Sequence, residues 1–266
     1  MNITFIGGGN MATALVSGLH KARPGRLELR VADPSEEARK QMMREYDVET
    51  FRDGREAVRG ADVVVLAVKP QIMPSVLEGL AEVIEGGQLV LSIAAGTTIA
   101  ELESALGAEH PVVRAMPNTP ALIGRGICGL YASENCRPHH REQAERIMRA
   151  AGDTMWIGDE ALMDVVTALS GSGPAYFFLL TEALAKAGAE LGLDEEDALR
   201  LAARTAEGAG AMLSDSEESA ATLRQRVTSP GGTTEAGVEV LEARGFHDLI
   251  REAVEAATRR GRELAG

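Results

Sequence analysis

A glycine-rich turn near the start of the chain is the feature that points most clearly to chemistry. Gly7-Gly8-Gly9-Asn10-Met11-Ala12 fits the pattern G-x-G-x-x-A, which can hold the pyrophosphate of a dinucleotide. In this pattern Gly7 permits the tight turn, Gly9 lets the backbone approach the phosphates, and the small Ala12 lets a helix pack close to the strand. The phosphates would lie at the helix N-terminus, where unpaired N–H groups favour anions. A strand–helix turn without a ligand is the alternative that the glycines alone leave open.

The residues around this turn predict the strand and the helix that a dinucleotide site needs. The apolar residues 3–6 indicate a short buried strand before the turn. After the turn, Leu15, Val16 and Leu19 fall on one face of a helix over residues 11–19. Strand, turn and helix therefore follow one another in the order that dinucleotide-binding units use.

An acidic residue, Asp33, follows a second predicted strand over residues 27–32. It lies 24 residues after Gly9, close to the spacing at which an acid hydrogen-bonds the hydroxyls of an adenine ribose. The run Asp33-Pro34-Ser35-Glu36 also fits the start of a helix, with a proline and acids in the first turn. Both roles can hold at once.

Strands and helices alternate as far as about residue 116, a pattern typical of a parallel, doubly wound sheet. Strands are expected over residues 3–6, 27–32, 48–51, 61–68, 89–93, 111–115, 126–132 and 153–157, and helices over 11–19, 36–46, 74–84, 99–106 and 139–151. Because the carboxyl ends of parallel strands share one edge of the sheet, Lys69, Ala95-Gly96 and Asn118 are expected beside the glycine turn. Lys69 is expected to position a cofactor or its loop, with a general acid as the alternative.

After about Asp159 the chain predicts helices alone. They are expected over residues 160–169, 174–191, 195–213, 219–226, 234–243 and 246–264. Many of their faces are rich in alanine, which favours close helix packing, and we expect them to form a dimer interface. The sequence therefore predicts an α/β domain over residues 1–158 and an all-helical domain over residues 159–266 that binds substrate and dimerises.

One loop between these helices has the composition of an anion-binding site. Thr228-Ser229-Pro230-Gly231-Gly232-Thr233-Thr234 combines small residues, free N–H groups and several hydroxyls just before a helix N-terminus. Such a loop can hold a carboxylate without any basic side chain. A simple helix connector of the same composition is the alternative.

The composition describes an acidic chain with an aliphatic core. Of its 266 residues 45% are hydrophobic and only 3% aromatic, and the formal net charge is −13. This charge argues against general nucleic-acid binding and against an anionic membrane surface, although helix N-termini can still bind phosphate locally. No signal peptide, transmembrane run or C-x-x-C motif is visible, so a reduced, cytoplasmic protein is expected. Cys136, His139 and His140 lack a fourth ligand at suitable spacing, and no metal site is predicted.

Six segments of the chain carry motifs that identify a family when they occur together. They are Phe5-Ile6-Gly7-Gly8-Gly9-Asn10-Met11-Ala12, Ala67-Val68-Lys69-Pro70-Gln71, Ser92-Ile93-Ala94-Ala95-Gly96, Arg114-Ala115-Met116-Pro117-Asn118-Thr119-Pro120, Leu169-Ser170-Gly171-Ser172-Gly173-Pro174-Ala175-Tyr176 and Val227-Thr228-Ser229-Pro230-Gly231-Gly232-Thr233-Thr234. In this order, and over nearly the whole chain, they resemble the Δ1-pyrroline-5-carboxylate reductase family, whose members catalyse the last step of proline biosynthesis. The last segment is close to the family's signature.

The resemblance implies a Rossmann domain followed by a helical domain that forms an intertwined dimer, sometimes assembled into larger rings. It implies hydride transfer from NADPH or NADH to C5 of a cyclic imine, giving L-proline. It assigns the pyrophosphate to Gly7, Gly8, Gly9, Asn10 and Met11, and further cofactor contacts to Val68, Lys69, Ala95 and Gly96, in addition to the ribose contact expected of Asp33. It assigns the substrate to Asn118, Ser229, Gly231, Gly232, Thr233 and Thr234, with Thr234 reaching the ring nitrogen, and Glu160 matches a substrate-side position.

Asp33 departs from the pattern of those family members that hold the 2′-phosphate of NADP with Ser or Asn-Arg at this place. A carboxylate repels that phosphate, so the choice between NADPH and NADH stays open, with Arg39 or Arg52 as compensating cations.

Hydride transfer to a protonated imine needs little acid–base machinery, because the cofactor supplies the chemistry and the protein supplies position. This agrees with the absence of a His–acid pair near the predicted sheet edge. Thr234 is expected to orient the ring nitrogen and is too weak an acid to be the main proton source. Two alternatives stay open: a reductase of a related small keto or hydroxy acid, and a dinucleotide-sensing protein without turnover.

Overall fold

The computed structural model describes residues 1–22 and 27–264, and their contacts divide the chain into two compact units. Met1–Ser172 and the C-terminal segment from Ala257 form the first unit, and Gly173–Ala256 form the second. The domain boundary predicted between residues 158 and 159 was placed where strands give way to helices in the sequence, and it stays a prediction. None of the helices in the described residues is long and apolar enough to cross a membrane.

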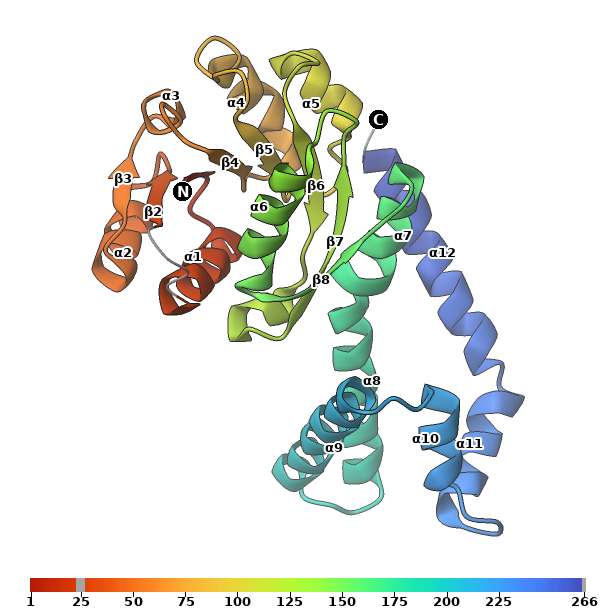
Figure 1. Ribbon diagram of the computed structural model, residues 1–266. Helices are drawn as coiled ribbons and strands as arrows, with labels where there is room; N and C mark the ends of the chain where they lie inside the picture. The colour runs from red at the N-terminus through yellow and green to blue at the C-terminus, as the bar shows by residue number, and fades with distance from the viewer. Residues whose placement is uncertain (23–26, 265–266) are drawn as a thin grey trace. The chain divides into compact units, whose positions relative to one another are not determined.

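The described part of the first unit is built on one eight-stranded sheet in the order β3-β2-β1-β4-β5-β6-β7-β8 (Figure 1). The strands are β1 (Asn2–Ile6), β2 (Glu28–Ala32), β3 (Glu49–Phe51), β4 (Val63–Leu66), β5 (Leu89–Ser92), β6 (Val112–Met116), β7 (Gly126–Ala132) and β8 (Gly152–Trp156). The first six strands are parallel, β7 runs antiparallel to β6, and β8 is parallel to β7. The order of the first six is that of a doubly wound dinucleotide-binding sheet, which confirms the predicted fold class.

Helices cover both faces of this sheet, as the term doubly wound implies (Figure 1). One face packs against α1 (Asn10–Ala22), α2 (Glu36–Tyr46) and α6 (Pro138–Arg149), and the other against α3 (Gly54–Ala57), α4 (Met73–Leu80) and α5 (Ile99–Leu106). The strands are apolar on both faces because both are buried: every residue of β4 is buried. In α1, Gly18 allows a close approach to the end of α6, since an added Cβ would lie only 1.9 Å from the Ala150 carbonyl oxygen.

Capping residues explain where the helices near the sheet edge begin. Ser35 precedes α2, and its Oγ accepts a hydrogen bond from the Ala38 N–H. Thr98 and Glu101 form a reciprocal capping box at the start of α5. These caps fix the first turns of helices that follow β2 and β5, and so position the loops in which Asp33 and Gly96 lie.

Residues 160–171 differ from the single helix expected over residues 160–169. A 3₁₀ turn over Glu160–Leu162 leads into α7 (Met163–Val166) and then into a π-helical turn over Thr167–Gly171. The wider turn is closed by the Ser172 N–H, which donates to the Thr167 carbonyl at 2.8 Å. An added Cβ at Gly171 would contact Met116 Cε, so this glycine packs against a side chain at the end of β6.

The second unit is helical. Its helices are α8 (Gly173–Glu190), α9 (Glu195–Asp215), α10 (Ala220–Arg226), α11 (Thr233–Ala243) and the first part of α12 (Phe246–Leu264). Asp194 caps α9 with its carboxylate, as expected from the sequence. Many large apolar side chains of this unit are exposed in the single chain, including Phe177, Phe178, Leu179, Leu184 and Leu201. Exposed apolar surface of this extent is typical of an interface with another chain.

Candidate active site

The loops that follow five parallel strands meet at one edge of the sheet. Backbone hydrogen bonds continue beyond the strand ends: the Gly7 N–H donates to the Ala32 carbonyl at 2.8 Å, and the Ala67 N–H donates to the Ile6 carbonyl at 2.8 Å. The glycine turn, Asp33, Lys69, the Ala95-Gly96 pair and Asn118 therefore all follow carboxyl ends at this edge, where open α/β sheets bind ligands.

The glycine turn has the geometry of a phosphate cradle. Gly7 has a φ of 103°, and an added Cβ there would lie 2.5 Å from the Ala67 carbonyl oxygen. Gly9 and Asn10 are exposed, and an added Cβ at Gly9 would meet no atom within 4 Å. The turn leads into the first turn of α1, whose N–H groups have no acceptor within the helix. Open backbone at a helix N-terminus fits the pyrophosphate of a dinucleotide.

Replacing Gly7 and Gly9 separately by alanine should separate folding from binding. Gly7→Ala is expected to lower the free energy of unfolding by at least about 2 kcal/mol, because the side chain would be strained at positive φ and would clash with Ala67. Gly9→Ala should leave the urea midpoint unchanged but weaken dinucleotide binding at least about 10-fold, since its Cβ enters the open space where phosphate would approach. Equal stability of Gly7→Ala and the unchanged chain would contradict this description of the turn.

The other predicted cofactor residues lie in the loops after β4 and β5. Val68 is half-buried, and its Cγ1 would lie 3.1 Å from a Cβ added at Gly7, so it forms one wall of the turn. Lys69 is exposed, and its ammonium makes no hydrogen bond or ion pair within residues 1–22 and 27–264. Ala95 and Gly96 are half-buried, and Gly96 has a φ of 78°. Small residues at this point leave the backbone accessible to a flat ring.

Asn118 holds three segments of the first unit together. Its Oδ1 accepts a hydrogen bond from the Ile127 N–H at 3.0 Å, and its Nδ2 donates to the Ser170 carbonyl at 3.1 Å. The residue is only 8% exposed. The amide thus ties the loop after β6 to the start of β7 and to the π-helical turn, and one of its N–H donors remains for a ligand.

Removing this amide should cost stability. Asn118→Ala is expected to lower the free energy of unfolding by about 1–3 kcal/mol, because a partly buried N–H and a partly buried carbonyl lose their partner. Asn135→Ala is the matched control: its Nδ2 also donates to a carbonyl, that of Ala108, but the bond is exposed. Urea denaturation should show a clearly smaller effect for the control. Similar losses for the two variants would mean that Asn118 does not hold these segments.

Glu160, expected on the substrate side, is bound to other residues of the first unit. Its Oε1 accepts a hydrogen bond from the Ile99 N–H at 2.9 Å and forms an ion pair with Arg114 Nη1 at 2.5 Å. The Arg114 side chain is 9% exposed and that of Glu160 is 27% exposed. Sequence reasoning missed Arg114, although a charged residue inside the otherwise apolar strand β6 is a signal that a buried partner must exist.

The Ser229–Thr234 loop of the second unit presents unoccupied polar groups. Ser229, Thr233 and Thr234 are exposed, and within the described residues the hydroxyls of Thr233 and Thr234 have no hydrogen-bond partner. Gly232 precedes α11, and its N–H donates to the Ser229 carbonyl at 2.9 Å, which closes the loop. The sequence did not indicate the part played by Glu235, whose carboxylate accepts the Gly231 N–H at 2.7 Å and so holds the loop in place.

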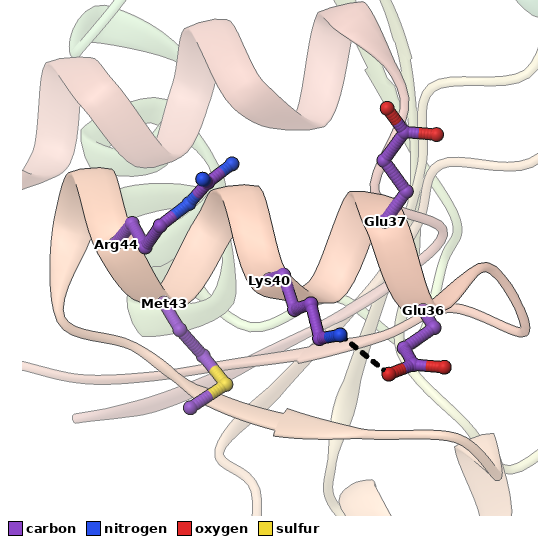
Figure 2. A pocket seen from close by; sticks show the side chains of 5 residues that line it. All are labelled: Glu36, Glu37, Lys40, Met43 and Arg44. Carbon is purple, nitrogen blue, oxygen red and sulfur yellow. Dashed lines mark ion pairs between the residues drawn. The ribbon is translucent and has the colours of Figure 1, made fainter.

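Among the described residues, the remaining thiols and metal-ligating side chains do not form a second catalytic or metal-binding site. Burial raises the pKa of the Cys128 thiol, and burial also raises the pKa of Cys136, so neither is a ready thiolate. No group of three or more His, Cys, Asp or Glu side chains in residues 1–22 and 27–264 could hold a metal ion. A surface hollow of about 500 Å³ along α2 is lined by Glu36, Glu37, Lys40, Met43 and Arg44 (Figure 2). It contains none of the predicted site residues.

The sheet order, the glycine turn and the helical second unit define the class of dinucleotide-dependent oxidoreductases with an all-helical second part. Residues 2–96 match a family model described as "NADP oxidoreductase coenzyme F420-dependent", and residues 160–264 match one described as "Pyrroline-5-carboxylate reductase dimerisation". Together these two matches cover most of the sheet's parallel part and nearly all of the helical part.

Full-length relatives define the family. A pyrroline-5-carboxylate reductase of Pseudomonas aeruginosa is 48% identical over 99% of this chain and 96% of the relative. The structure of a pyrroline-5-carboxylate reductase from Coxiella burnetii has a TM-score of 0.94 at 43% identity, covering 100% of this chain and 98% of the other. That of Plasmodium falciparum pyrroline carboxylate reductase, with NADP bound, has a TM-score of 0.87 at 31% identity with the same coverage. The chain belongs to the pyrroline-5-carboxylate reductase family, which confirms the identification made from the six motifs.

Proposed function

We propose that the enzyme reduces Δ1-pyrroline-5-carboxylate to L-proline, with hydride from NADH or NADPH. The observation that carries the proposal is the presence, in one chain of this family, of an open phosphate cradle at Gly7–Met11 and of the exposed Ser229–Thr234 loop. The cradle suits a dinucleotide, and the loop suits a small carboxylate.

The first unit supplies the residues that would hold the cofactor. The pyrophosphate would be bound by Gly7, Gly8, Gly9, Asn10 and Met11, and the adenine ribose by Asp33. Val68 and Lys69 would touch the cofactor, and Ala95 and Gly96 would lie beside the nicotinamide. When bound, the cofactor supplies a hydride, which is the chemistry that the protein's own side chains lack. The contribution of these residues is to fix its position and to leave the backbone accessible.

The second unit supplies the residues that would hold the substrate. The hydroxyls of Ser229 and Thr233 and the Thr233 N–H would bind the carboxylate, in the absence of a basic side chain. Gly231 and Gly232 would shape the loop around it, since their own N–H groups donate to Glu235 and to the Ser229 carbonyl. The Thr234 hydroxyl would orient the ring nitrogen, and water would deliver the proton. In the balanced reaction, Δ1-pyrroline-5-carboxylate, NAD(P)H and one proton are converted to L-proline and NAD(P)⁺. The hydride forms the new C–H bond at C5. We assign Asn118 and Glu160 to the substrate side as positioning residues.

We also propose a homodimer, which larger assemblies can extend into rings. The exposed apolar side chains of the second unit and the match to a dimerisation model support this assembly. A cytoplasmic location completes the proposal, and it is supported by two cysteines, Cys128 and Cys136, that form no disulfide.

The activity is tested by following loss of nicotinamide absorbance with Δ1-pyrroline-5-carboxylate, in parallel with small 2-keto acids of similar size. We expect fast oxidation with the cyclic imine alone. Faster oxidation with a 2-keto acid would favour the related-acid reductase. A folded protein that binds dinucleotide but oxidises it with none of these substrates would favour a sensor.

A further inference from the structure

The carboxylate of Asp33 is held in one orientation at the end of β2. Its Oδ2 accepts a hydrogen bond from the Gly8 N–H, and its Oδ1 accepts one from the Ser35 N–H, both at 2.8 Å. A Cβ added at Gly8 would lie 3.4 Å from Oδ2, so the carboxylate is packed directly against the glycine turn. It therefore joins the phosphate cradle to the loop that leads into α2.

The backbone around this carboxylate is also held. The Asp33 N–H donates to the Phe51 carbonyl at 3.0 Å. Arg39 reaches back from α2, and its Nη1 donates to the Asp33 carbonyl at 2.6 Å and to the Pro34 carbonyl at 3.0 Å. Asp33 is thus a fixed negative charge, and the cation nearest to it in sequence is engaged with backbone oxygens.

We propose that Asp33 makes the enzyme prefer NADH to NADPH, a preference that rests on the proposed use of a nicotinamide cofactor. A carboxylate has about four acceptor positions, and two N–H donors use only part of them, so it can still accept the 2′- and 3′-hydroxyls of a ribose. A 2′-phosphate carries between about one and a half and two negative charges near neutral pH and would approach a carboxylate that cannot turn away. The Gly8 and Ser35 N–H groups already donate to the Asp33 carboxylate.

Charged side chains of both signs follow Asp33 in the chain. The first turn of α2 carries Glu36 and Glu37, so the helix N-terminus nearest to Asp33 is acidic. Lys40 forms an exposed ion pair with Glu36, which Figure 2 shows, with 2.7 Å between Nζ and Oε1. Arg52, which follows β3, is exposed and is the remaining basic residue that the sequence indicated for a 2′-phosphate. The named charges around Asp33 are therefore of both signs, and the fixed carboxylate of Asp33 itself carries the preference.

Dissociation constants for NADH and NADPH, measured without substrate by the change in nicotinamide fluorescence, test the proposal. The unchanged enzyme should bind NADH at least about 10-fold more tightly than NADPH. Asp33→Ser should weaken the binding of NADH and strengthen the binding of NADPH. The ratio of the two dissociation constants should therefore shift in favour of NADPH by at least about 30-fold. Asp62→Ser is the matched control, because Asp62 also accepts a backbone N–H, that of Asn2, but precedes β4 at the opposite edge of the sheet. The ratio of the NADH and NADPH dissociation constants of this variant should stay within twofold of that of the unchanged enzyme.

Tighter binding of NADPH than of NADH by the unchanged enzyme would overturn the proposal without any variant. So would a folded Asp33→Ser variant whose ratio stays within twofold of the unchanged enzyme, with Asp33→Asn as the second substitution if the serine variant does not fold. Because these constants are measured without substrate, they are independent of the reaction. A preference for NADH in an enzyme that fails to reduce Δ1-pyrroline-5-carboxylate would support the role of Asp33 and contradict only the proposed function.

Discussion

Replacing Thr234 by alanine is expected to lower kcat by about 10²- to 10³-fold while leaving the dissociation constant for NADH unchanged. Thr234 is the second residue of α11, is exposed, and its hydroxyl has no partner among the described residues. A hydroxyl without a partner at the start of a helix is available to a ligand. Without it, the ring nitrogen of the substrate should no longer be held in the orientation that hydride transfer needs. The cofactor contacts proposed above come from the first unit, so they should not change.

Two further substitutions separate the hydroxyl from the shape of the side chain. Thr234→Ser keeps the hydroxyl and should keep kcat within about 10-fold of the unchanged enzyme, whereas Thr234→Val keeps the shape and should be as slow as alanine. Thr205→Ala is the control, since Thr205 is exposed on α9 and its hydroxyl donates to the Leu201 carbonyl. Full activity of Thr234→Ala would remove Thr234 from the mechanism.

Replacing Arg114 by methionine should lower the free energy of unfolding by about 3 kcal/mol. The change leaves the Glu160 carboxylate without its cation in a largely buried position. The Glu160 carboxylate also accepts the Ile99 N–H, so the start of α5 loses order together with the ion pair. Urea denaturation of the unliganded enzyme measures the effect directly.

Glu160→Gln distinguishes a positioning role of Glu160 from direct contact with substrate. If Glu160 acts by holding Arg114 and α5, the variant should be less stable, and its effect should not add to that of Arg114→Met in the double variant. The exposed pair Arg251–Asp248 is the control, because breaking it should cost less than about 1 kcal/mol. A Glu160→Gln variant with unchanged stability but a large increase in KM would instead place Glu160 on the substrate.

Local signals in the sequence predicted most of the elements. The helix expected over residues 36–46 is α2 with the same bounds, because Ser35 caps its start and acids fill its first turn. The strand expected over residues 126–132 is β7 with the same bounds. The glycine pattern after β1 also identified a turn at the sheet edge whose backbone has a positive φ at Gly7 and is open at Gly9.

Contacts between distant residues explain what the sequence did not predict. Arg114 and Glu160 are 46 residues apart, and Asn118 and Ser170 are 52 residues apart, so no periodicity links them. The π-helical turn at Thr167–Gly171 was expected as ordinary helix, and in the structure its Gly171 lies against Met116, a residue distant in the sequence. The hydrogen bond from Gly8 to Asp33 was likewise hidden, although each residue had been identified by its own motif.

The measurement that tests the proposed reaction most directly is the fate of the transferred hydrogen. NADH carrying deuterium at C4 of the nicotinamide, prepared with the label on either face, is incubated with Δ1-pyrroline-5-carboxylate and the enzyme. One of the two preparations should give L-proline with a single deuterium at C5, detected by mass spectrometry and NMR, and the other should give unlabelled L-proline. Failure to form proline, or proline without deuterium at C5 from both preparations, would contradict hydride transfer to the cyclic imine.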